Sequence, residues 1–207
     1  MSVPPDPLAQ PDVARLAWRL RERPGAHAPA GPEVRRAAVA LVLRPDAASG
    51  LDLLFIKRAD YEGDPWSGQV AFPGGRHEPH DADLLDTAVR ETREETGVDL
   101  GADGVLLGTL DDLWPRTPVL PPIVVRPYVF ALEPDVPFAL SAEVAAAFWA
   151  PLGLLRAPDA TFEATVLVRG EERRVPALRH VDYTIWGMTE RIFRNLLERW
   201  EEAAGAG

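Results

Sequence analysis

Residues 74–97 read GGRHEPHDADLLDTAVRETREETG, a glycine turn that leads into a helical run ending at Gly97. Successive residues of an α-helix advance by about 100°, so Glu91 and Glu95 lie side by side and Glu94 flanks them. The opposite, core-facing side of this helix is expected to carry Leu85, Ala88, Val89, Thr92 and Thr96. The stretch therefore predicts a helix that packs on a core and gathers three carboxylates into one sector.

Two interpretations of these carboxylates are open. Like charges four residues apart destabilise a helix by roughly 0.2–0.5 kcal/mol, and a hard divalent cation such as Mg²⁺ or Mn²⁺ would offset that repulsion. A run rich in Glu and Arg is also typical of a solvated helix face. The five fixed residues of the pattern Arg-Glu-x-x-Glu-Glu-x-Gly, here residues 90–97, coincide by chance about once in 10⁶ positions. This rarity favours a cation site.

The spacing resembles the Nudix box, the loop-helix-loop of enzymes that hydrolyse a nucleoside diphosphate linked to another moiety. The family pattern is Gly, five residues, Glu, seven residues, then Arg-Glu-apolar-x-Glu-Glu-x-Gly-apolar. This chain departs from it twice. The interval from Gly75 to Arg90 is one residue longer, which places Asp81 near the position of the first Glu, and Thr92 replaces an apolar residue. The resemblance implies a Nudix hydrolase.

The longer interval and an upstream segment resemble the coenzyme A pyrophosphatase branch. The chain matches that branch at Leu53-Leu54, Lys57-Arg58-Ala59 and residues 68–75, but residues 63–67 lack its internal Arg and add one residue. The resemblance implies cleavage of coenzyme A or acyl-coenzyme A to 3′,5′-ADP and (acyl-)4′-phosphopantetheine. ADP-ribose, dinucleotides and nucleoside triphosphates stay open as substrates. A non-catalytic nucleotide-binding module is the remaining alternative, and the retained box glutamates disfavour it.

The resemblance also implies roles for individual residues. Glu91, Glu94 and Glu95 are the implied ligands of Mg²⁺ or Mn²⁺, and the carbonyl of Gly75 is a further ligand. Glu91 and Glu94 belong to the implied catalytic set, with Glu94 either a ligand or the group that positions the water. Arg90 completes that set as the internal partner that orients a glutamate.

The roles outside the box leave more alternatives. Glu143 is the candidate general base, and an ordinary glutamate in the first turn of a helix is the alternative. Arg58 is the candidate clamp for a diphosphate, beside the bare backbone of Gly74 and Gly75, and it could equally be a solvated strand end. Asp81 either pairs with Arg90 or caps the helix. Other candidates are Arg116 and Arg126 for the diphosphate, and Trp66 and Trp114 for stacking or core packing.

The amino-acid composition limits the kinds of molecule that the protein is expected to bind. A formal net charge of −10 argues against a nucleic-acid surface, and a small-molecule nucleotide remains compatible because a bound cation inverts the local field. The chain has no Cys, no apolar run of about 20 residues and no signal-peptide pattern. We expect a cytoplasmic protein without a membrane span, and a homodimer stays open.

Hydrophobic patterning predicts a mixed α/β fold, which the resemblance sharpens to the Nudix α/β/α sandwich. Residues 1–33 are expected to form an N-terminal extension with a helix over 13–23, capped by Asp12 and followed by a linker over 24–32. Residues 34–204 are expected to form the Nudix hydrolase domain. Strands are expected at 36–43, 51–57, 69–72, 105–110, 123–132, 164–168 and 173–177, and further helices at 142–148 and 185–200.

Overall fold

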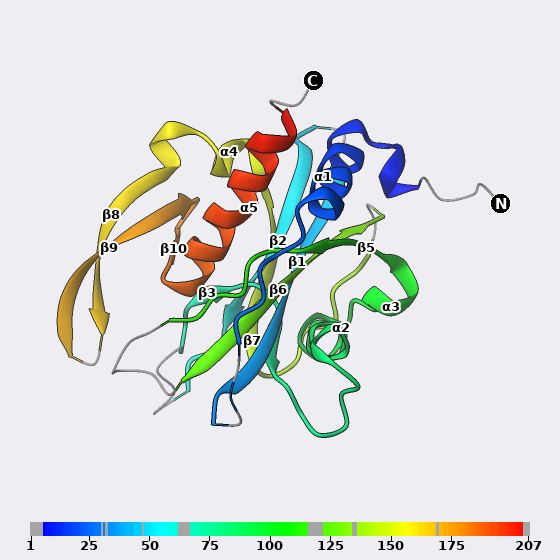
Figure 1. The fold of residues 1–207 in the computed structure, drawn as a ribbon. Helices are drawn as coiled ribbons and strands as arrows, with labels where there is room; N and C mark the ends of the chain where they lie inside the picture. The colour runs from blue at the N-terminus through cyan, green and yellow to red at the C-terminus, as the bar shows by residue number, and fades with distance from the viewer. Residues whose placement is uncertain are drawn as a thin grey trace.

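A mixed β-sheet forms the centre of the computed structural model, which describes residues 6–29, 31, 33–46, 48–61, 67–115, 122–133, 136–168 and 170–204 (Figure 1). The strands run in the order β3-β2-β1-β6-β5, with β4 paired to β1 and β7 paired to β2. Strands β1 and β6 are parallel, and the other pairings are antiparallel. The strand bounds are β1 Arg35–Asp46, β2 Gly50–Arg58, β3 Val70–Ala71, β4 Gly74–Arg76, β5 Gly104–Thr109, β6 Ile123–Leu132 and β7 Val144–Pro151.

Strands β1 and β2 pair at one end of the sheet and separate at the other. The hairpin register runs from Leu43 opposite Leu53 to Asp46 opposite Gly50. Beyond it, β1 pairs with β4 and β2 pairs with β3 instead. The amide of Ala40 donates to the carbonyl of Pro73, which lies between β3 and β4. The glycine turn is therefore held inside the split of the sheet.

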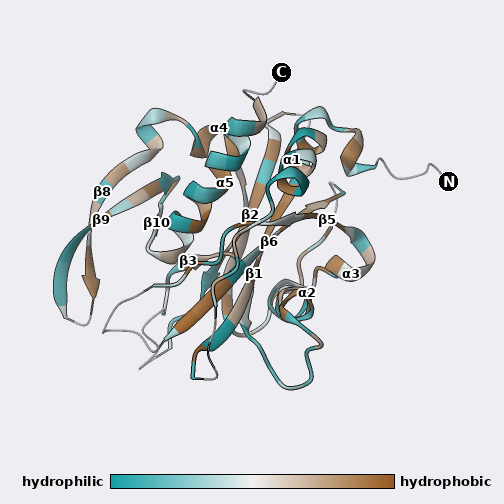
Figure 2. Cartoon of the chain, viewed as in Figure 1, coloured by the Kyte–Doolittle hydropathy of each residue, from teal (hydrophilic) through white to brown (hydrophobic). Residues whose placement is uncertain are grey.

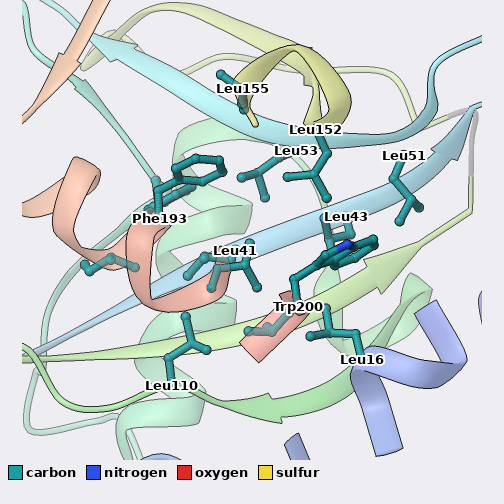
Figure 3. Close-up of a cluster of buried hydrophobic side chains, with 14 of the residues drawn as sticks. Leu16, Leu41, Leu43, Leu51, Leu53, Leu110, Leu152, Leu155, Phe193 and Trp200 are labelled. Atoms are coloured by element: carbon teal, nitrogen blue, oxygen red, sulfur yellow. The ribbon is translucent and has the colours of Figure 1, made fainter. Parts of the chain in front are cut away.

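Alternating side chains of the sheet bury two separate apolar clusters. Leu41 and Leu43 of β1 face helices α1 (Pro11–Glu22) and α5 (Met188–Ala204), where Leu16 and Trp200 complete the cluster (Figure 3). The intervening Ala40 and Val42 pack with residues of α2 (Leu84–Thr96) and α3 (Leu100–Asp103). The helices around the sheet carry both hydrophobic residues, drawn in brown, and hydrophilic residues, drawn in teal (Figure 2). A sheet between two helical layers confirms the predicted α/β/α sandwich.

The N-terminal helix is part of the first cluster. Its stripe of Val13, Leu16, Ala17 and Leu20 is buried as predicted, and its residues Arg19 and Arg23 form ion pairs with Glu202 of α5. The predicted cap was wrong. The helix begins at Pro11, and the side chain of Gln10 accepts from the amides of Asp12 and Val13. Asp12 lies in the first turn and pairs with Arg15 instead.

The segment predicted as a linker packs along the end of β5. The amide of Ala26 donates to Asp111 Oδ1 over 2.8 Å, and the amide of Asp112 donates to the carbonyl of Ala26 over 2.9 Å. A Cβ atom at Gly25 would overlap the carbonyl of Leu110, so this close approach requires glycine. The segment around Gly25 and Ala26 is therefore held against the residues that follow β5.

Residues 142–148 do not form the predicted helix, because they enter the sheet as the start of β7. Phe148 pairs with Phe55 of β2, and the two rings stack at 5.8 Å. Pairing along the whole of β2 thus overrides the helix propensity of an alanine-rich run. After β7 come α4 (Leu152–Leu155) and a three-stranded sheet of β8 (Thr161–Val168), β9 (Glu171–His180) and β10 (Tyr183–Trp186).

The closing helix begins later than predicted, at Met188, since Tyr183–Trp186 pair with β9 and Gly187 takes a positive φ of 71°. Two short 3₁₀ turns, Pro7–Ala9 and Pro158–Ala160, complete the elements. Within the described residues, no helix combines the length and the apolarity needed to cross a membrane.

Candidate active site

Helix α2 is fixed at both ends by its own sequence. The side chain of Asp83 caps its start by accepting from the amides of Leu85 and Asp86. Its end is Gly97, whose left-handed φ of 78° is the conformation that glycine adopts at a helix C-terminus. The helix predicted to end at Gly97 is confirmed. A loop over residues 77–83 joins this helix to β4, which begins at the glycine turn held in the split of the sheet.

Glu95 points inward from this helix to the glycine turn. The residue is 5% exposed, and its Oε2 accepts from the amide of Gly74 over 2.9 Å. Burial raises the pKa of Glu95 to about 8, the Gly74 hydrogen bond opposes that shift, and the charge of Glu91 adds to it. A carboxylate in this position favours either a proton or a cation beside it.

Glu91 lies one turn before Glu95 and contacts the same loop. A Cβ atom at position 75 would overlap the Glu91 carboxylate, so the carboxylate rests against bare backbone at Gly75. Burial raises the pKa of Glu91, and the adjacent Arg90 opposes the shift. Two carboxylates and the backbone of the glycine turn therefore meet at one end of the sheet.

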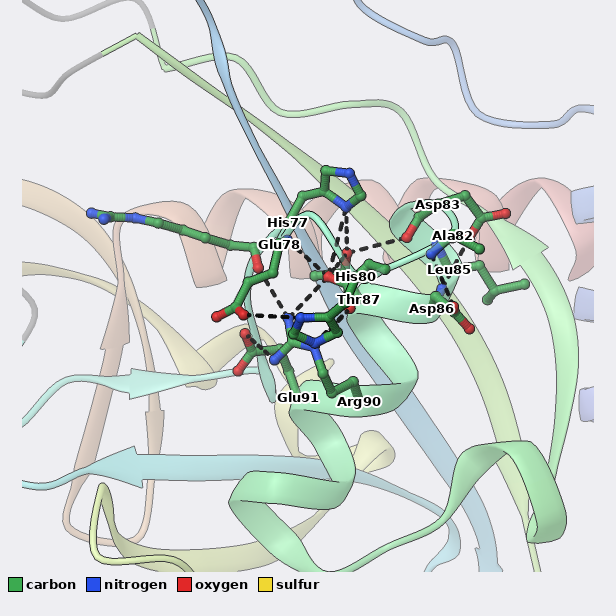
Figure 4. A network of polar contacts seen from close by, with 12 residues as sticks. His77, Glu78, His80, Ala82, Asp83, Leu85, Asp86, Thr87, Arg90 and Glu91 are labelled. Atoms are coloured by element: carbon green, nitrogen blue, oxygen red, sulfur yellow. Dashed lines mark hydrogen bonds and ion pairs between the residues drawn. The ribbon is translucent and has the colours of Figure 1, made fainter.

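Arg90 connects Glu91 to the buried Asp81, and Figure 4 shows Arg90 beside Glu91 within this network of polar contacts. Its Nε and Nη2 donate to Asp81 over 2.8 and 3.0 Å, and its Nη1 lies 3.0 Å from both Glu91 Oε1 and Glu94 Oε2. The Arg90 guanidinium holds the pKa of Asp81 well below its usual range. Asp81 therefore pairs with Arg90, while Asp83 caps the helix.

Thr87 supports Asp81 from within α2. Its Oγ1 donates to Asp81 Oδ2 over 2.9 Å, and the amide of Glu78 donates to the same oxygen over 2.9 Å. The sequence pattern alone did not predict this role for Thr87. The one signal for it is a hydroxyl on the side of the helix that faces the preceding loop.

The donors at the glycine turn fit a hard divalent cation in type. Among the residues that the structure describes, no three carboxylate or imidazole groups converge on one point, because Arg90 holds Glu94 outward, where its side chain is 59% exposed. Glu91 and Glu95 remain as an inward-facing pair of carboxyl groups beside the backbone of Gly74 and Gly75. Burial is the main cause of their raised pKa values, and the charges of Arg90 and Arg58 oppose it only in part.

Comparison with known proteins identifies the family. The NUDIX domain model matches residues 34–169 of this chain. The chain belongs to the Nudix family. Over 137 residues it is 34% identical to the uncharacterized Nudix hydrolase NudL of Escherichia coli O1:K1 / APEC, and 35% identical to NudL of Cronobacter sakazakii. Each match spans 63% of this chain and 66% of the relative, just under two thirds of its length.

A solved structure shows the same Nudix architecture. The MutT/nudix family protein from Enterococcus faecalis superimposes with a TM-score of 0.54 at 18% sequence identity, over 90% of this chain and 68% of that one. The likeness at this identity concerns the fold alone. It agrees with the mixed sheet between two helical layers described above.

Two residues predicted outside the Nudix box lie within electrostatic reach of Glu95. The charge of Arg58 lowers the pKa of Glu95, whereas the charge of Glu143 raises it. Their strands are joined, since the amide of Ala59 donates to the carbonyl of Glu143 over 2.8 Å. The helical alternative for Glu143 was wrong, because Glu143 precedes strand β7.

Arg126 and Trp114 are the other candidates that the structure describes. Arg126 is engaged by Asp112, to which its Nε and Nη2 donate over 2.8 and 2.9 Å. Trp114 is partly buried, and Trp66 and Arg116 fall outside the described residues. His180 stacks on the ring of Phe148 at 5.7 Å.

The raised pKa of Glu95 predicts how stability depends on pH when a chelator removes divalent cations. Between the ordinary pKa of 4.5 and about 8, the folded protein holds a proton that the unfolded chain has lost. The free energy of unfolding should therefore fall as pH rises through this window. Urea unfolding at about pH 5 and pH 8 would measure the fall, and Glu95→Gln should reduce it. Equal falls in both proteins would contradict the prediction.

Proposed function

We propose that this chain is a divalent-metal-dependent Nudix pyrophosphohydrolase that cleaves a nucleoside diphosphate derivative, with coenzyme A or acyl-coenzyme A as its first substrate. The proposed catalytic domain comprises residues 34–204, and residues 1–33 are an extension of it. The observation that carries the proposal is the buried pair of Glu91 and Glu95 against the glycine turn. Membership of the Nudix family and relatives named as Nudix hydrolases support it.

The metal ligands in this proposal are Glu91, Glu95, the Gly75 carbonyl and Glu94 after it turns inward. A bound Mg²⁺ or Mn²⁺ would neutralise charge on the diphosphate and lower the pKa of a water molecule. Arg90 holds Glu91 in place, since its Nη1 lies 3.0 Å from Glu91 Oε1.

Hydrolysis then requires a carboxylate that accepts a proton from the attacking water. The water oxygen forms a bond to phosphorus, the bridging P–O bond breaks, and the leaving phosphate takes the released electron pair. Glu143 is the proposed base, because it acts electrostatically on Glu95, and Glu94 is the ligand or the group that positions the water. Arg58 is the proposed clamp for the diphosphate, since its charge also reaches Glu95.

The substrate proposal rests on the residues around the glycine turn. Asp81 occupies the longer interval typical of the coenzyme A branch, and it anchors Arg90. The expected products are 3′,5′-ADP and 4′-phosphopantetheine, or its acylated form. ADP-ribose, dinucleotides and nucleoside triphosphates are the alternative substrates, since residues 63–67 depart from the branch pattern. The proposed partner is thus a small nucleotide.

A substrate panel tests the proposal. The purified protein, with Mg²⁺ or Mn²⁺, is incubated with coenzyme A, acetyl-coenzyme A, ADP-ribose, a dinucleoside polyphosphate and a nucleoside triphosphate, and the products are identified by mass. We expect the highest kcat/KM for coenzyme A or its acyl form, and no turnover in excess chelator. A higher kcat/KM for ADP-ribose would overturn the substrate assignment. Turnover in chelator would overturn the metal dependence.

A further inference from the structure

The phenol ring of Tyr61 is exposed yet held in place just beyond the end of β2. The residue is 50% exposed. Its hydroxyl donates to the carbonyl of Ala142 over 3.1 Å, and its backbone amide donates to Ser67 Oγ over 2.8 Å. A planar apolar surface fixed in this way loses little conformational freedom when a ligand covers it.

The same contacts tie Tyr61 to the chain segments that carry two charged groups of the candidate site. Tyr61 follows Arg58 by three residues, and its partner Ala142 directly precedes Glu143. Arg58 and Glu143 both act on the carboxyl of Glu95. In the described part of the chain, two large aromatic side chains are exposed, those of Tyr61 and Trp18. Trp18 lies on helix α1, whereas Tyr61 lies just beyond the end of β2.

We propose that Tyr61 is the stacking platform for the nucleobase of the substrate and thereby a specificity-determining residue. This inference rests on the proposed function, which assigns the diphosphate to the neighbouring charged groups. A nucleobase presents a flat π-face that an aromatic side chain binds without hydrogen-bond readout. A ring fixed next to the diphosphate site supplies that surface, and it adds affinity for the part of the substrate that does not react.

The competing role for Tyr61 is a clasp that fastens the end of β2 to the start of β7. Tyr61→Phe removes the bond to Ala142 and keeps the ring, whereas Tyr61→Ala removes both. Stacking predicts that Tyr61→Ala weakens binding of 3′,5′-ADP, measured by calorimetry, by on the order of 10- to 100-fold. Tyr61→Phe should stay within about threefold of the wild type. Trp18→Ala is the matched control and should change nothing.

Inorganic pyrophosphate, which has no base, provides the second measurement. Its affinity should be the same in the wild type and in Tyr61→Ala. Equal losses for the Phe and Ala variants, an equal loss for pyrophosphate, or no loss of 3′,5′-ADP binding would overturn the platform. So would a wild type that binds neither 3′,5′-ADP nor AMP. If Tyr61 governs 3′,5′-ADP binding while the wild type hydrolyses no diphosphate, the proposed function fails and the platform stands.

Discussion

Replacing Glu95 with Gln is expected to lower kcat by more than about 100-fold while the protein stays folded. Changes to groups that merely orient a metal ligand cost roughly 10- to 100-fold, and Glu95 is proposed to contact the metal itself. The amide keeps the shape of the side chain but removes the anionic oxygen that accepts from Gly74. Steady-state turnover of coenzyme A with Mg²⁺, together with thermal unfolding, measures both parts of the prediction.

The affinity of the variant for Mn²⁺ shows whether loss of a metal ligand causes the fall in kcat. Isothermal titration with Mn²⁺ should show weaker binding to Glu95→Gln, and a higher Mn²⁺ concentration should restore part of the activity. Glu172→Gln makes the same chemical change on the exposed strand β9 and should behave as the wild type. Turnover of Glu95→Gln within about threefold of the wild type would remove this helix from the mechanism.

Removing the carboxyl of Asp81 is expected to cost both stability and activity. The Asp81 side chain is 2% exposed and that of Arg90 is 17% exposed, so Asp81→Ala leaves a largely buried cation without its bidentate partner. Breaking a buried pair in this way typically costs about 3–5 kcal/mol, and the partial exposure of Arg90 favours the lower value. Urea unfolding measures the loss.

Asp83→Ala is the matched control for Asp81→Ala, since Asp83 caps the same helix without contacting Arg90. Loss of an N-cap costs about 1 kcal/mol and should leave kcat nearly unchanged at a temperature where the protein is folded. Asp81→Ala should lower kcat under the same conditions, because Arg90 then loses the partner that fixes it beside Glu91. Equal effects of the two variants on kcat would exclude Asp81 from positioning the carboxylates.

Local patterns were sufficient to predict the elements that carry their own signals. The box helix has a cap, an apolar side and a terminal glycine within one stretch, and the β1–β2 hairpin has two apolar runs around a turn. The sandwich followed from these elements together with the family resemblance. Residues 142–148 lack such signals, and their conformation depends on pairing with β2, which is far away in the sequence.

Local sequence patterns also failed to predict the contacts around the candidate active site. Asp81 and Arg90 are nine residues apart, a spacing that no regular helix brings together, so pairing and capping stayed open until the loop geometry decided between them. Tyr61 was overlooked because its partner Ala142 lies 81 residues further along the chain. The outward orientation of Glu94 could not be predicted either, since it depends on the guanidinium of Arg90.

The packing of α1 against α5 has a consequence for protein synthesis. Leu16 on α1 leaves the ribosome long before its neighbour Trp200 on α5 (Figure 3). A 12-residue helix is marginal in water on its own. The apolar side chains of α1 that pack on α5 therefore stay uncovered until α5 has emerged, and the first core cluster closes only then. A nascent chain stalled before α5 would expose these side chains to chaperones and proteases.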